Sequence, residues 1–370
     1  MNIVFGIDDK FVMPCGVTMT SICENNKMET ICFHILTPPE FKESSKQSLT
    51  KIAVERYGKE ITFHAVDLVR LKDCPINMGA DNGRIATYFR FLLPLILTDI
   101  DKAIYMDSDL IIRHSLREFW DTNLDGYAVG VCPGENNDDV RESNRLRYDA
   151  SIGYFNAGVL LLNLKYWRER NVLQRLLDYG ASHPKLPQQD QDCLNAVLKD
   201  EKKVLDIKYN LQENMLVPID KVLLDWHRFD ELEAAIKDPV VIHYTSSLKP
   251  WYSDCEHPYM GEWRKYLSMT EWSGMKMRAR YPNARYVRLV RTVLSSMKMC
   301  QPNRNKFREG LKLYTRGTVS TRKGEDDHVL DSLSHHRSPN GLSVSVPIQD
   351  TVLSPSTIAS YVISRWFSLI

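Results

Sequence analysis

The chain has 370 residues and lacks three features that would place it in a specialised class of protein. Its eight cysteines show no short paired spacings of the kind found in zinc sites or disulfide frameworks, so we expect reduced thiols in a cytosol. No stretch approaches the ~20 apolar residues that a membrane-spanning helix needs. The formal net charge of +1 gives no reason to expect that the whole chain binds nucleic acid.

The first residues also lack the features of an export signal. The apolar run over residues 3–7 is short, has no basic leader and is followed at once by Asp8 and Asp9. Export signals combine a basic start with a longer apolar segment. We therefore expect this part of the chain to face the cytoplasm.

The composition is that of an ordinary globular protein, with 43% hydrophobic and 10% aromatic residues. Strand-like apolar segments alternate with helix-like segments along the first two thirds of the chain, which indicates an α/β structure with a mostly parallel sheet. The predicted strands cover residues 2–7, 31–36, 61–66, 103–106, 127–132, 158–164 and 240–244. The predicted helices cover residues 12–24, 39–57, 84–97, 165–179 and 190–198.

The character of the sequence changes near its end. Residues 276–323 are strongly basic, with Glu309 as the only acidic residue, and residues from about 318 onward are rich in serine, which predicts a poorly ordered tail. We therefore expect three parts, which are a catalytic domain over 1–265, a basic helical segment over 266–317 and a disordered tail over 318–370.

The basic segment contains a predicted amphipathic helix. Its apolar face carries Tyr286, Leu289, Val290, Val293, Leu294 and Met297, and its other face carries Arg285, Arg288, Arg291 and Lys298. A basic amphipathic helix suits an anionic bilayer surface, which we expect to be the partner of residues 276–323. The alternative is a helix that packs its apolar face on the catalytic domain. No nucleic-acid recognition motif accompanies the charge.

The most informative motif is Asp107-Ser108-Asp109, which directly follows the apolar run over residues 103–106. Two carboxylates one residue apart project from the same side of an extended backbone. They repel each other unless something neutralises them, and a divalent cation does so economically. The motif therefore indicates a metal site at the end of a buried strand, although a solvated turn is the alternative for this triplet alone.

Three other polar segments also lie at the end of a predicted strand or at the start of a predicted helix. Asp8 ends the first predicted strand, Asp190 opens a short helix, and His243 closes the last predicted strand, with Lys249 shortly after it. Ligands of open α/β sheets collect beyond the carboxyl ends of strands. If the strands are parallel neighbours, these residues converge with the Asp-x-Asp motif. Each also has a simpler alternative. Asp8 could cap a helix, Asp190 could belong to a solvated helix start, His243 could be a buried core histidine, and Lys249 could be a surface lysine.

Taken together, these segments resemble glycosyltransferase family 8, especially the bacterial galactosyl- and glucosyltransferases of lipopolysaccharide and lipooligosaccharide core assembly. The resemblance covers roughly residues 1–265 and implies the A-type glycosyltransferase fold, which is Rossmann-like. The matching segments are residues 3–9, Ala86-Thr87-Tyr88-Phe89-Arg90, residues 105–109, Tyr154-Phe155-Asn156-Ala157-Gly158-Val159, Gln189-Asp190-Gln191-Asp192, and His243-Tyr244 with Lys249-Pro250-Trp251.

The resemblance also implies a role for individual residues. The implied metal ligands are Asp107, Asp109 and His243, for Mn²⁺ or Mg²⁺. The implied donor-binding residues are Asp8, Asp9, Arg90, Asp107, Ser108, Asn156, Ala157, Asp190, Gln191, Ser246 and Lys249. The implied catalytic residues are Gln191, below the anomeric carbon, and Asp190.

The implied reaction is a retaining, metal-dependent transfer of glucose or galactose from a UDP-sugar to a lipopolysaccharide core or another lipid-linked glycan, at the cytoplasmic face of the bacterial inner membrane. Three departures from the family pattern leave the choice between UDP-glucose and UDP-galactose open. Lys10 stands where close relatives often carry Asn, Pro133-Gly134 stands where an Asp commonly contacts the donor sugar, and Ser246 replaces a Gly.

Two other functions compete with this one. A phosphohydrolase would use Asp107 as its nucleophile, but such enzymes carry the motif on an early strand and give His243 no role. A sugar-binding protein that has lost turnover is the second competitor, against which the intact set of implied ligands and catalytic residues argues.

Overall fold

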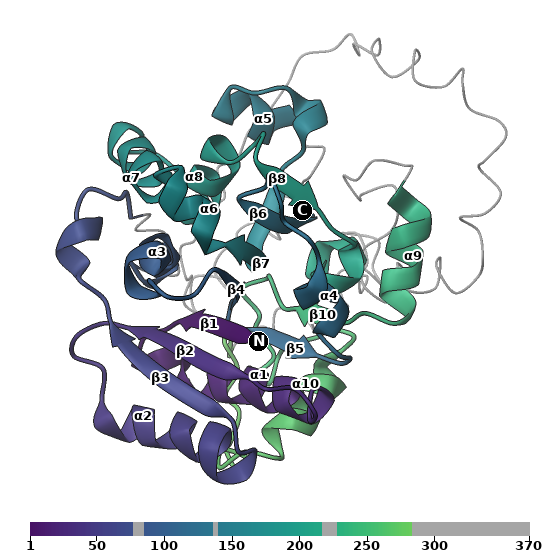
Figure 1. Ribbon diagram of the computed structural model, residues 1–370. Helices are drawn as coiled ribbons and strands as arrows, with labels where there is room; N and C mark the ends of the chain where they lie inside the picture. The colour runs from purple at the N-terminus through teal and green to yellow at the C-terminus, as the bar shows by residue number, and fades with distance from the viewer. Residues whose placement is uncertain (77–84, 136–139, 217–227, 283–370) are drawn as a thin grey trace, which may run out of the picture. The chain divides into compact units, whose positions relative to one another are not determined.

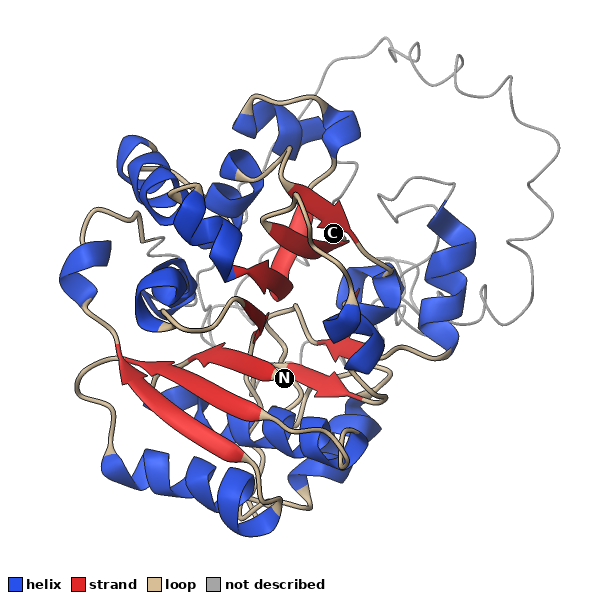
Figure 2. Cartoon of the chain, viewed as in Figure 1, coloured by secondary structure: helices blue, strands red, loops and turns tan. Residues whose placement is uncertain are grey.

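The computed structural model describes residues 1–76, 85–135, 140–216 and 228–282. Within these ranges a seven-stranded sheet has the order β3-β2-β1-β4-β7-β6-β8 (Figures 1 and 2). Its strands are β1 (Asn2–Gly6), β2 (Cys32–Thr37), β3 (Glu60–Ala65), β4 (Lys102–Met106), β6 (Val129–Pro133), β7 (Phe155–Asn163) and β8 (Lys202–Val204). β7 runs antiparallel to β4 and β6, and the other pairs are parallel. The prediction of a mostly parallel sheet is therefore confirmed.

A second, three-stranded sheet lies at the end of β4. It contains β5 (Leu110–Ile112), β10 (Val241–His243) and β9 (Leu211–Gln212) in the order β5-β10-β9. β10 is antiparallel to β5 and parallel to β9. The strand of His243 is therefore not a parallel neighbour in the main sheet, which was the condition considered above for its convergence with the Asp-x-Asp motif. It pairs instead with β5 and β9, two short strands that were not predicted from the sequence.

Helices cover both faces of the main sheet (Figure 1). They are α1 (Val12–Asn25), α2 (Glu43–Thr50), α3 (Leu93–Ile96), α4 (Arg117–Asp121), α5 (Val140–Leu146), α6 (Leu164–Glu169), α7 (Val172–Ser182), α8 (Asp190–Val197), α9 (Phe229–Lys237) and α10 (Met260–Leu267). A 3₁₀ helix over Ile85–Leu92 precedes α3. The predicted helix over 165–179 is divided, because Asn171 between α6 and α7 has a φ of 50°. The helix predicted from residue 39 begins only at Glu43.

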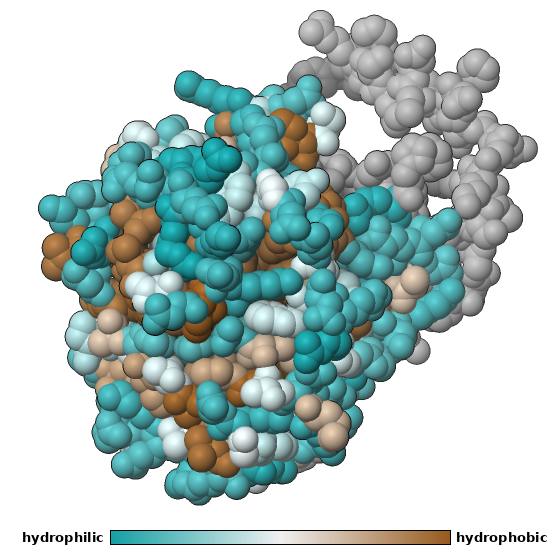
Figure 3. All heavy atoms as spheres, viewed as in Figure 1, coloured by the Kyte–Doolittle hydropathy of each residue, from teal (hydrophilic) through white to brown (hydrophobic). Residues whose placement is uncertain are grey.

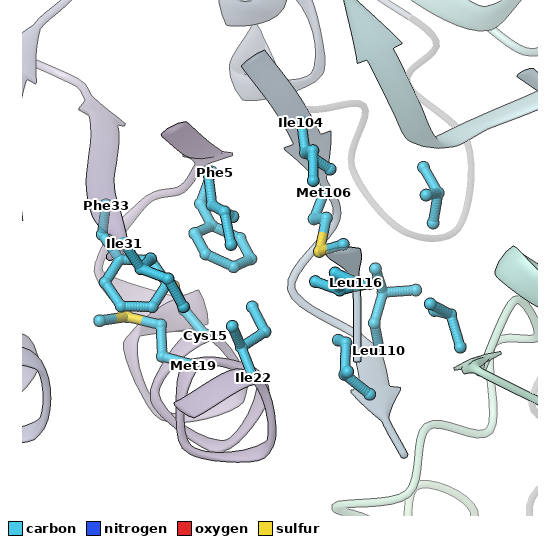
Figure 4. Close-up of a cluster of buried hydrophobic side chains, with 14 of the residues drawn as sticks. Phe5, Cys15, Met19, Ile22, Ile31, Phe33, Ile104, Met106, Leu110 and Leu116 are labelled. Carbon is cyan, nitrogen blue, oxygen red and sulfur yellow. The ribbon is translucent and has the colours of Figure 1, made fainter. Parts of the chain in front are cut away.

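The apolar core has two layers, one on each face of the main sheet. Ile3 and Phe5 of β1 point into the layer beneath α1, whereas Val4 points into the other layer. This alternation follows from the two-residue period of a strand, and burial of both faces explains why β1 is apolar throughout. Figure 4 shows Phe5 and Phe33 beside Met19 and other side chains of α1. On the face of the molecule seen in Figure 3, hydrophilic residues cover most of the surface.

Folded contacts continue beyond residue 265, the predicted end of the catalytic domain. The Trp272 ring packs so closely on α1 that a Cβ added at Gly16 would lie 2.5 Å from it. The Asp254 carboxylate accepts hydrogen bonds from the backbone N–H groups of Arg280 and Tyr281. No helix among the described residues is long and apolar enough to cross a membrane. The predicted amphipathic helix and the predicted disordered tail lie outside the described residues.

Candidate functional site

The Asp-x-Asp motif forms the junction between the two sheets. β4 ends at Met106, and β5 begins at Leu110, directly after Asp109. The antiparallel register of β5 and β10 pairs Leu110 with His243, and the next backbone N–H, that of Tyr244, donates to the Asp109 carbonyl oxygen at 3.1 Å. The pairing of two short strands therefore places His243 beside the motif.

The three predicted metal ligands meet at this junction. His243 Nε2 lies 3.3 Å from Asp109 Oδ1 and 4.0 Å from Asp107 Oδ2, and one ligand atom from each residue lies within 4.8 Å of the other two. Atoms that share a hard divalent cation at about 2.0–2.6 Å are separated by comparable distances. Asp109 Oδ1 is also buried without a hydrogen bond from any described residue, which a cation would remedy. Two carboxylates and an imidazole thus fit a divalent metal ion.

Protein cations hold the outer oxygens of both carboxylates. Arg90 Nη2 lies 2.9 Å from Asp107 Oδ1, and Lys249 Nζ lies 2.6 Å from Asp109 Oδ2 and 2.6 Å from the Tyr244 carbonyl oxygen. Burial alone would raise the pKa of Asp109, but the Lys249 ammonium, which has the largest opposing effect, helps to hold that pKa below its ordinary value. Asp109 is therefore ionised and available as a ligand at neutral pH.

Arg90 joins Asp107, one of the three predicted metal ligands, to Asp190. The guanidinium is buried, its Nε lies 3.2 Å from Asp190 Oδ2, and it covers the Tyr105 ring at 3.9 Å. It also donates to the carbonyl oxygen of Ala157. Burial raises the pKa of Asp190 to about 6, against the opposing effect of Arg90. The residues predicted to grip the donor sugar are thus linked to the predicted metal site through one guanidinium.

The Gln191 amide is fixed in a single orientation at the start of α8. Its Oε1 accepts from the Ala157 N–H at 2.9 Å, and its Nε2 donates to the Tyr154 hydroxyl at 3.0 Å. That hydroxyl donates in turn to Asp192 Oδ1 at 2.8 Å, and Arg145 binds both oxygens of Asp192 at 2.6 and 2.7 Å. Tyr154 and Asp192 belong to motifs that were identified in the sequence, whereas no sequence pattern indicated Arg145.

A pocket opens beside the motif and extends to the end of β1. Its lining residues are Gly6, Ile7, Asp8, Phe11, Ala86, Thr87, Arg90, Tyr105, Asp107, Ser108 and Asp109. The Asp8 carboxylate also accepts from the Lys10 N–H at 2.8 Å, so Asp8 both caps a helical turn and faces the pocket. Asp8, Arg90 and the Asp-x-Asp motif are therefore brought together, as predicted.

Three predicted donor-binding residues have other contacts. The Asp9 carboxylate is directed toward the start of α2, where it accepts from Ser45 Oγ at 2.6 Å, and Asp9 does not line the pocket. Asn156 Oδ1 accepts from the Gly158 N–H and from Asn210 Nδ2, both at 2.9 Å. The backbone N–H of Ser246 donates to Glu213 Oε2 at 3.3 Å. The structure thus gives Asp9 and Asn156 structural contacts that the sequence did not indicate.

Comparison with known proteins agrees with this geometry. Residues 2–255 match the model of the family "Glycosyl transferase family 8". A lipopolysaccharide 1,3-galactosyltransferase of Salmonella typhimurium is 29% identical over 280 residues, which cover 74% of this chain and 79% of that protein. The lipopolysaccharide glucosyltransferase WaaO of Escherichia coli is 27% identical over 259 residues, which cover 68% of this chain and 73% of that protein.

A solved structure shows the same fold. The galactosyltransferase LgtC, in complex with donor and acceptor sugar analogs, is 25% identical to this chain and superposes with a TM-score of 0.64. The match covers 74% of this chain and 99% of that one. The predicted A-type glycosyltransferase fold is therefore confirmed. The chain belongs to glycosyltransferase family 8 and is a glycosyltransferase.

Proposed function

We propose that the enzyme transfers a hexose, glucose or galactose, from a UDP-sugar to a lipopolysaccharide core or another lipid-linked glycan, with retention of configuration. The observation that carries the proposal is the convergence of Asp107, Asp109 and His243 beside a pocket lined by Asp8 and Arg90. The functions of the Salmonella and Escherichia relatives supply the acceptor class and the two candidate sugars.

The metal would be Mn²⁺ or Mg²⁺, held by Asp107, Asp109 and His243. When bound, it would supply positive charge for the diphosphate that leaves as the glycosidic bond breaks. The Lys249 ammonium adds a positive charge at the edge of the same group, 2.6 Å from Asp109 Oδ2. Charge of this kind is most useful where negative charge develops in the transition state. Mn²⁺ suits the imidazole nitrogen better than Mg²⁺ does.

We assign the sugar-binding role to Arg90, Asp190 and Gln191. Arg90 holds Asp190 through the 3.2 Å contact of its Nε, and the Ala157 N–H holds Gln191 Oε1. A neutral amide lacks the charge of a carboxylate nucleophile, so Gln191 favours departure and attack on the same face of the sugar, with a leaving-phosphate oxygen accepting the proton of the acceptor. A covalent intermediate on Asp190 is the alternative mechanism.

Two variants distinguish these mechanisms. Gln191→Ala should reduce kcat by about 10²-fold or more, because the amide faces the carbon that becomes positively charged. Asp190→Asn should weaken donor use, and neither the wild type nor Gln191→Ala should carry a glycosyl group on Asp190 in intact-protein mass spectra after incubation with the donor. Substantial activity in Gln191→Ala, together with a glycosyl group on Asp190 that is absent from Asp190→Asn, would overturn same-face transfer.

In the segment near Gly134 this chain lacks the aspartate that commonly contacts the donor sugar in relatives. A Cβ added there would lie 2.8 Å from the Tyr154 carbonyl oxygen, and the Gly134 N–H donates to that oxygen at 2.9 Å. An aspartate, which relatives commonly carry here, would need this backbone to move. The hydroxyl that distinguishes the two sugars must therefore be recognised by other groups, so we expect specificity to differ from that of relatives with the aspartate.

The proposal is tested by a donor screen that measures released UDP. UDP-glucose, UDP-galactose and their N-acetyl forms are incubated with Mn²⁺, with and without a truncated core oligosaccharide. Release that requires metal and is lost in Asp109→Asn, but not in the exposed control Asp121→Asn, supports the transferase. Release of phosphate from simple esters would identify a phosphohydrolase, and donor binding with no turnover would identify a binding protein.

We also propose that the enzyme acts at the cytoplasmic face of the bacterial inner membrane, held there by residues 276–323. This position follows from a lipid-linked acceptor and from the basic amphipathic pattern of that segment.

A further inference from the structure

His243 can act as a metal ligand through Nε2 only if that nitrogen carries a lone pair. The proton of the neutral ring must then reside on Nδ1. Nδ1 lies 2.9 Å from Asn210 Oδ1, on the side of the ring away from the two aspartates. The partner of Nδ1 therefore decides whether Nε2 is able to bind a cation.

The orientation of the Asn210 amide is settled by a chain of hydrogen bonds that starts at the backbone. The Gly158 N–H can only donate, and it donates to Asn156 Oδ1 at 2.9 Å. The same oxygen accepts from Asn210 Nδ2 at 2.9 Å, so the Asn210 amino group faces Asn156 and its oxygen faces His243. Because Asn210 accepts, His243 donates from Nδ1 and presents the lone pair of Nε2 to the aspartates.

Because Asn210 and His243 are buried, one orientation of the Asn210 amide is strongly favoured over the other. The exposed fraction is 0% for Asn210 and 3% for His243, so no bulk water can replace the hydrogen bonds between them. Turning the Asn210 amide over would oppose two acceptors at Asn156, and buried polar groups without a partner cost about 1–3 kcal/mol each. The backbone N–H of Gly158 thus fixes the tautomer of His243 through two side-chain amides.

The short strands explain why Asn210 reaches His243. Asn210 immediately precedes β9, and the parallel pairing of β9 with β10 sets Gln212 opposite His243. We infer that Asn210 is a positioning residue, which holds His243 in the Nδ1–H tautomer and in the orientation that binds the cation of the proposed function. Its amide does this without adding a third negative charge to Asp107 and Asp109.

Two substitutions of similar shape separate this role from a purely structural one. Asn210→Asp keeps an acceptor for His243 Nδ1–H but cannot donate to Asn156. Asn210→Leu removes both hydrogen bonds. If the acceptor matters, the aspartate variant retains metal binding and the leucine variant loses it. If only the bond to Asn156 matters, both variants lose metal binding to the same extent.

The primary measurement is the Mn²⁺ affinity of the full chain at saturating UDP, followed by the electron paramagnetic resonance signal of free Mn²⁺. We expect Asn210→Leu to weaken binding by about 10–100-fold, as the loss of a partner of a metal-bound histidine does. Asn210→Asp should stay within a few-fold of the wild type. UDP affinity without metal and the melting temperature are measured to confirm that both variants are folded.

A second measurement needs no metal. Nitrogen-15 NMR of labelled histidine, assigned by the signal missing in His243→Gln, should show the Nδ1–H tautomer in the wild type and its loss in Asn210→Leu. Unchanged Mn²⁺ affinity in Asn210→Leu, or equal weakening in both variants, would overturn the inference. Failure of the wild type to bind Mn²⁺ would instead overturn the proposed metal dependence, and the NMR result would still test the role of Asn210.

Discussion

At the scale of single residues, Gly158 leaves room for Asp107 and His243, two of the three residues proposed to hold a metal ion. A Cβ added at this position would lie 2.3 Å from His243 Cε1 and 2.9 Å from Asp107 Oδ2. The Gly158 carbonyl oxygen also accepts from the Asp107 N–H at 2.8 Å, so the backbone here cannot easily withdraw. The position therefore requires the absence of a side chain rather than unusual backbone dihedrals.

Gly158→Ala should consequently displace His243 or Asp107. We expect Mn²⁺ affinity at saturating UDP to fall by about 10-fold or more, as it does when ligand geometry is disturbed, while the circular dichroism spectrum stays that of a folded protein. Gly261→Ala is the matched control, because nothing lies within 4 Å of the added Cβ on α10. The control should keep wild-type affinity and gain roughly 0.5–1 kcal/mol of stability. Equal Mn²⁺ affinity in the two variants would contradict this explanation of Gly158.

The sequence predicts some of these residues and not others, for a physical reason. Asp107 and Asp109 stand out because an unusual charge pattern follows a buried strand. Asn210 has no such signal, since an isolated asparagine between two apolar residues is common and its importance comes from a contact with His243, 33 residues away. A residue whose role depends on another side chain is recognised only when the fold is known.

At the scale of secondary structure, β2 and β3 carry a pair of neighbouring histidines, of which His34 is buried and His64 is half-buried. His34 Nδ1 lies 3.2 Å from His64 Nε2 on neighbouring parallel strands, and the exposed fraction of His34 is 6%. Burial, with a smaller effect of His64, lowers the pKa of His34 to about 4. Burial also lowers the pKa of His64. The folded chain therefore resists protonation of this pair.

The pair should make stability depend on pH. An unfolded histidine has a pKa of about 6.5, so between pH 6.5 and 4 the unfolded chain binds a proton that the folded chain does not. Stability is fully present above this range and falls as the pH is lowered through it, by about 2 kcal/mol for His34 between pH 7.5 and 5.0. In urea unfolding between pH 7.5 and 5.0, the free energy of unfolding of His34→Gln should therefore fall by about 2 kcal/mol less than that of the wild type.

His183→Gln, which removes an exposed histidine of the segment after α7, is the control and should lose stability with pH as the wild type does. An identical loss in His34→Gln and the wild type would mean that the folded chain accepts the proton on His34.

The longer strands of the main sheet were predictable because each contains an apolar run of several residues, whereas β8 of that sheet and β5, β9 and β10 of the second sheet have only two or three residues each. The position of such a short strand is determined by the strands that it pairs with, and not by its own sequence. The apolar residues before His243 reveal β10 in the sequence, but nothing in the sequence reveals its pairing with β5.

At the scale of the whole molecule, we expect attachment to a membrane to depend on the basic residues of the predicted amphipathic helix. Replacing Arg285, Arg288, Arg291 and Lys298 by glutamine in the full chain removes four basic residues from the predicted helix. Each contributes about 1 kcal/mol near an anionic surface, so binding to anionic vesicles should fall by roughly 10²–10³-fold in a sedimentation assay.

The matched control replaces four exposed lysines of the described fold, Lys27, Lys51, Lys237 and Lys265, by glutamine. This control loses the same formal charge and should still sediment with the vesicles. Equal sedimentation of all three proteins would show that residues 276–323 do not hold the enzyme at a membrane. UDP release without acceptor should be unaffected in both variants, because neither changes the pocket.

The position of Asp107-Ser108-Asp109 between two sheets has a consequence for stability. Asp107 follows the last residue of β4, and His243 belongs to β10, so a cation shared by these side chains would connect two sheets that already share the buried cluster containing Ile3, Leu110 and Val241. Because such a cation would bind the folded chain and not the unfolded one, loading the site would raise the melting temperature of the whole domain in proportion to the logarithm of the metal concentration.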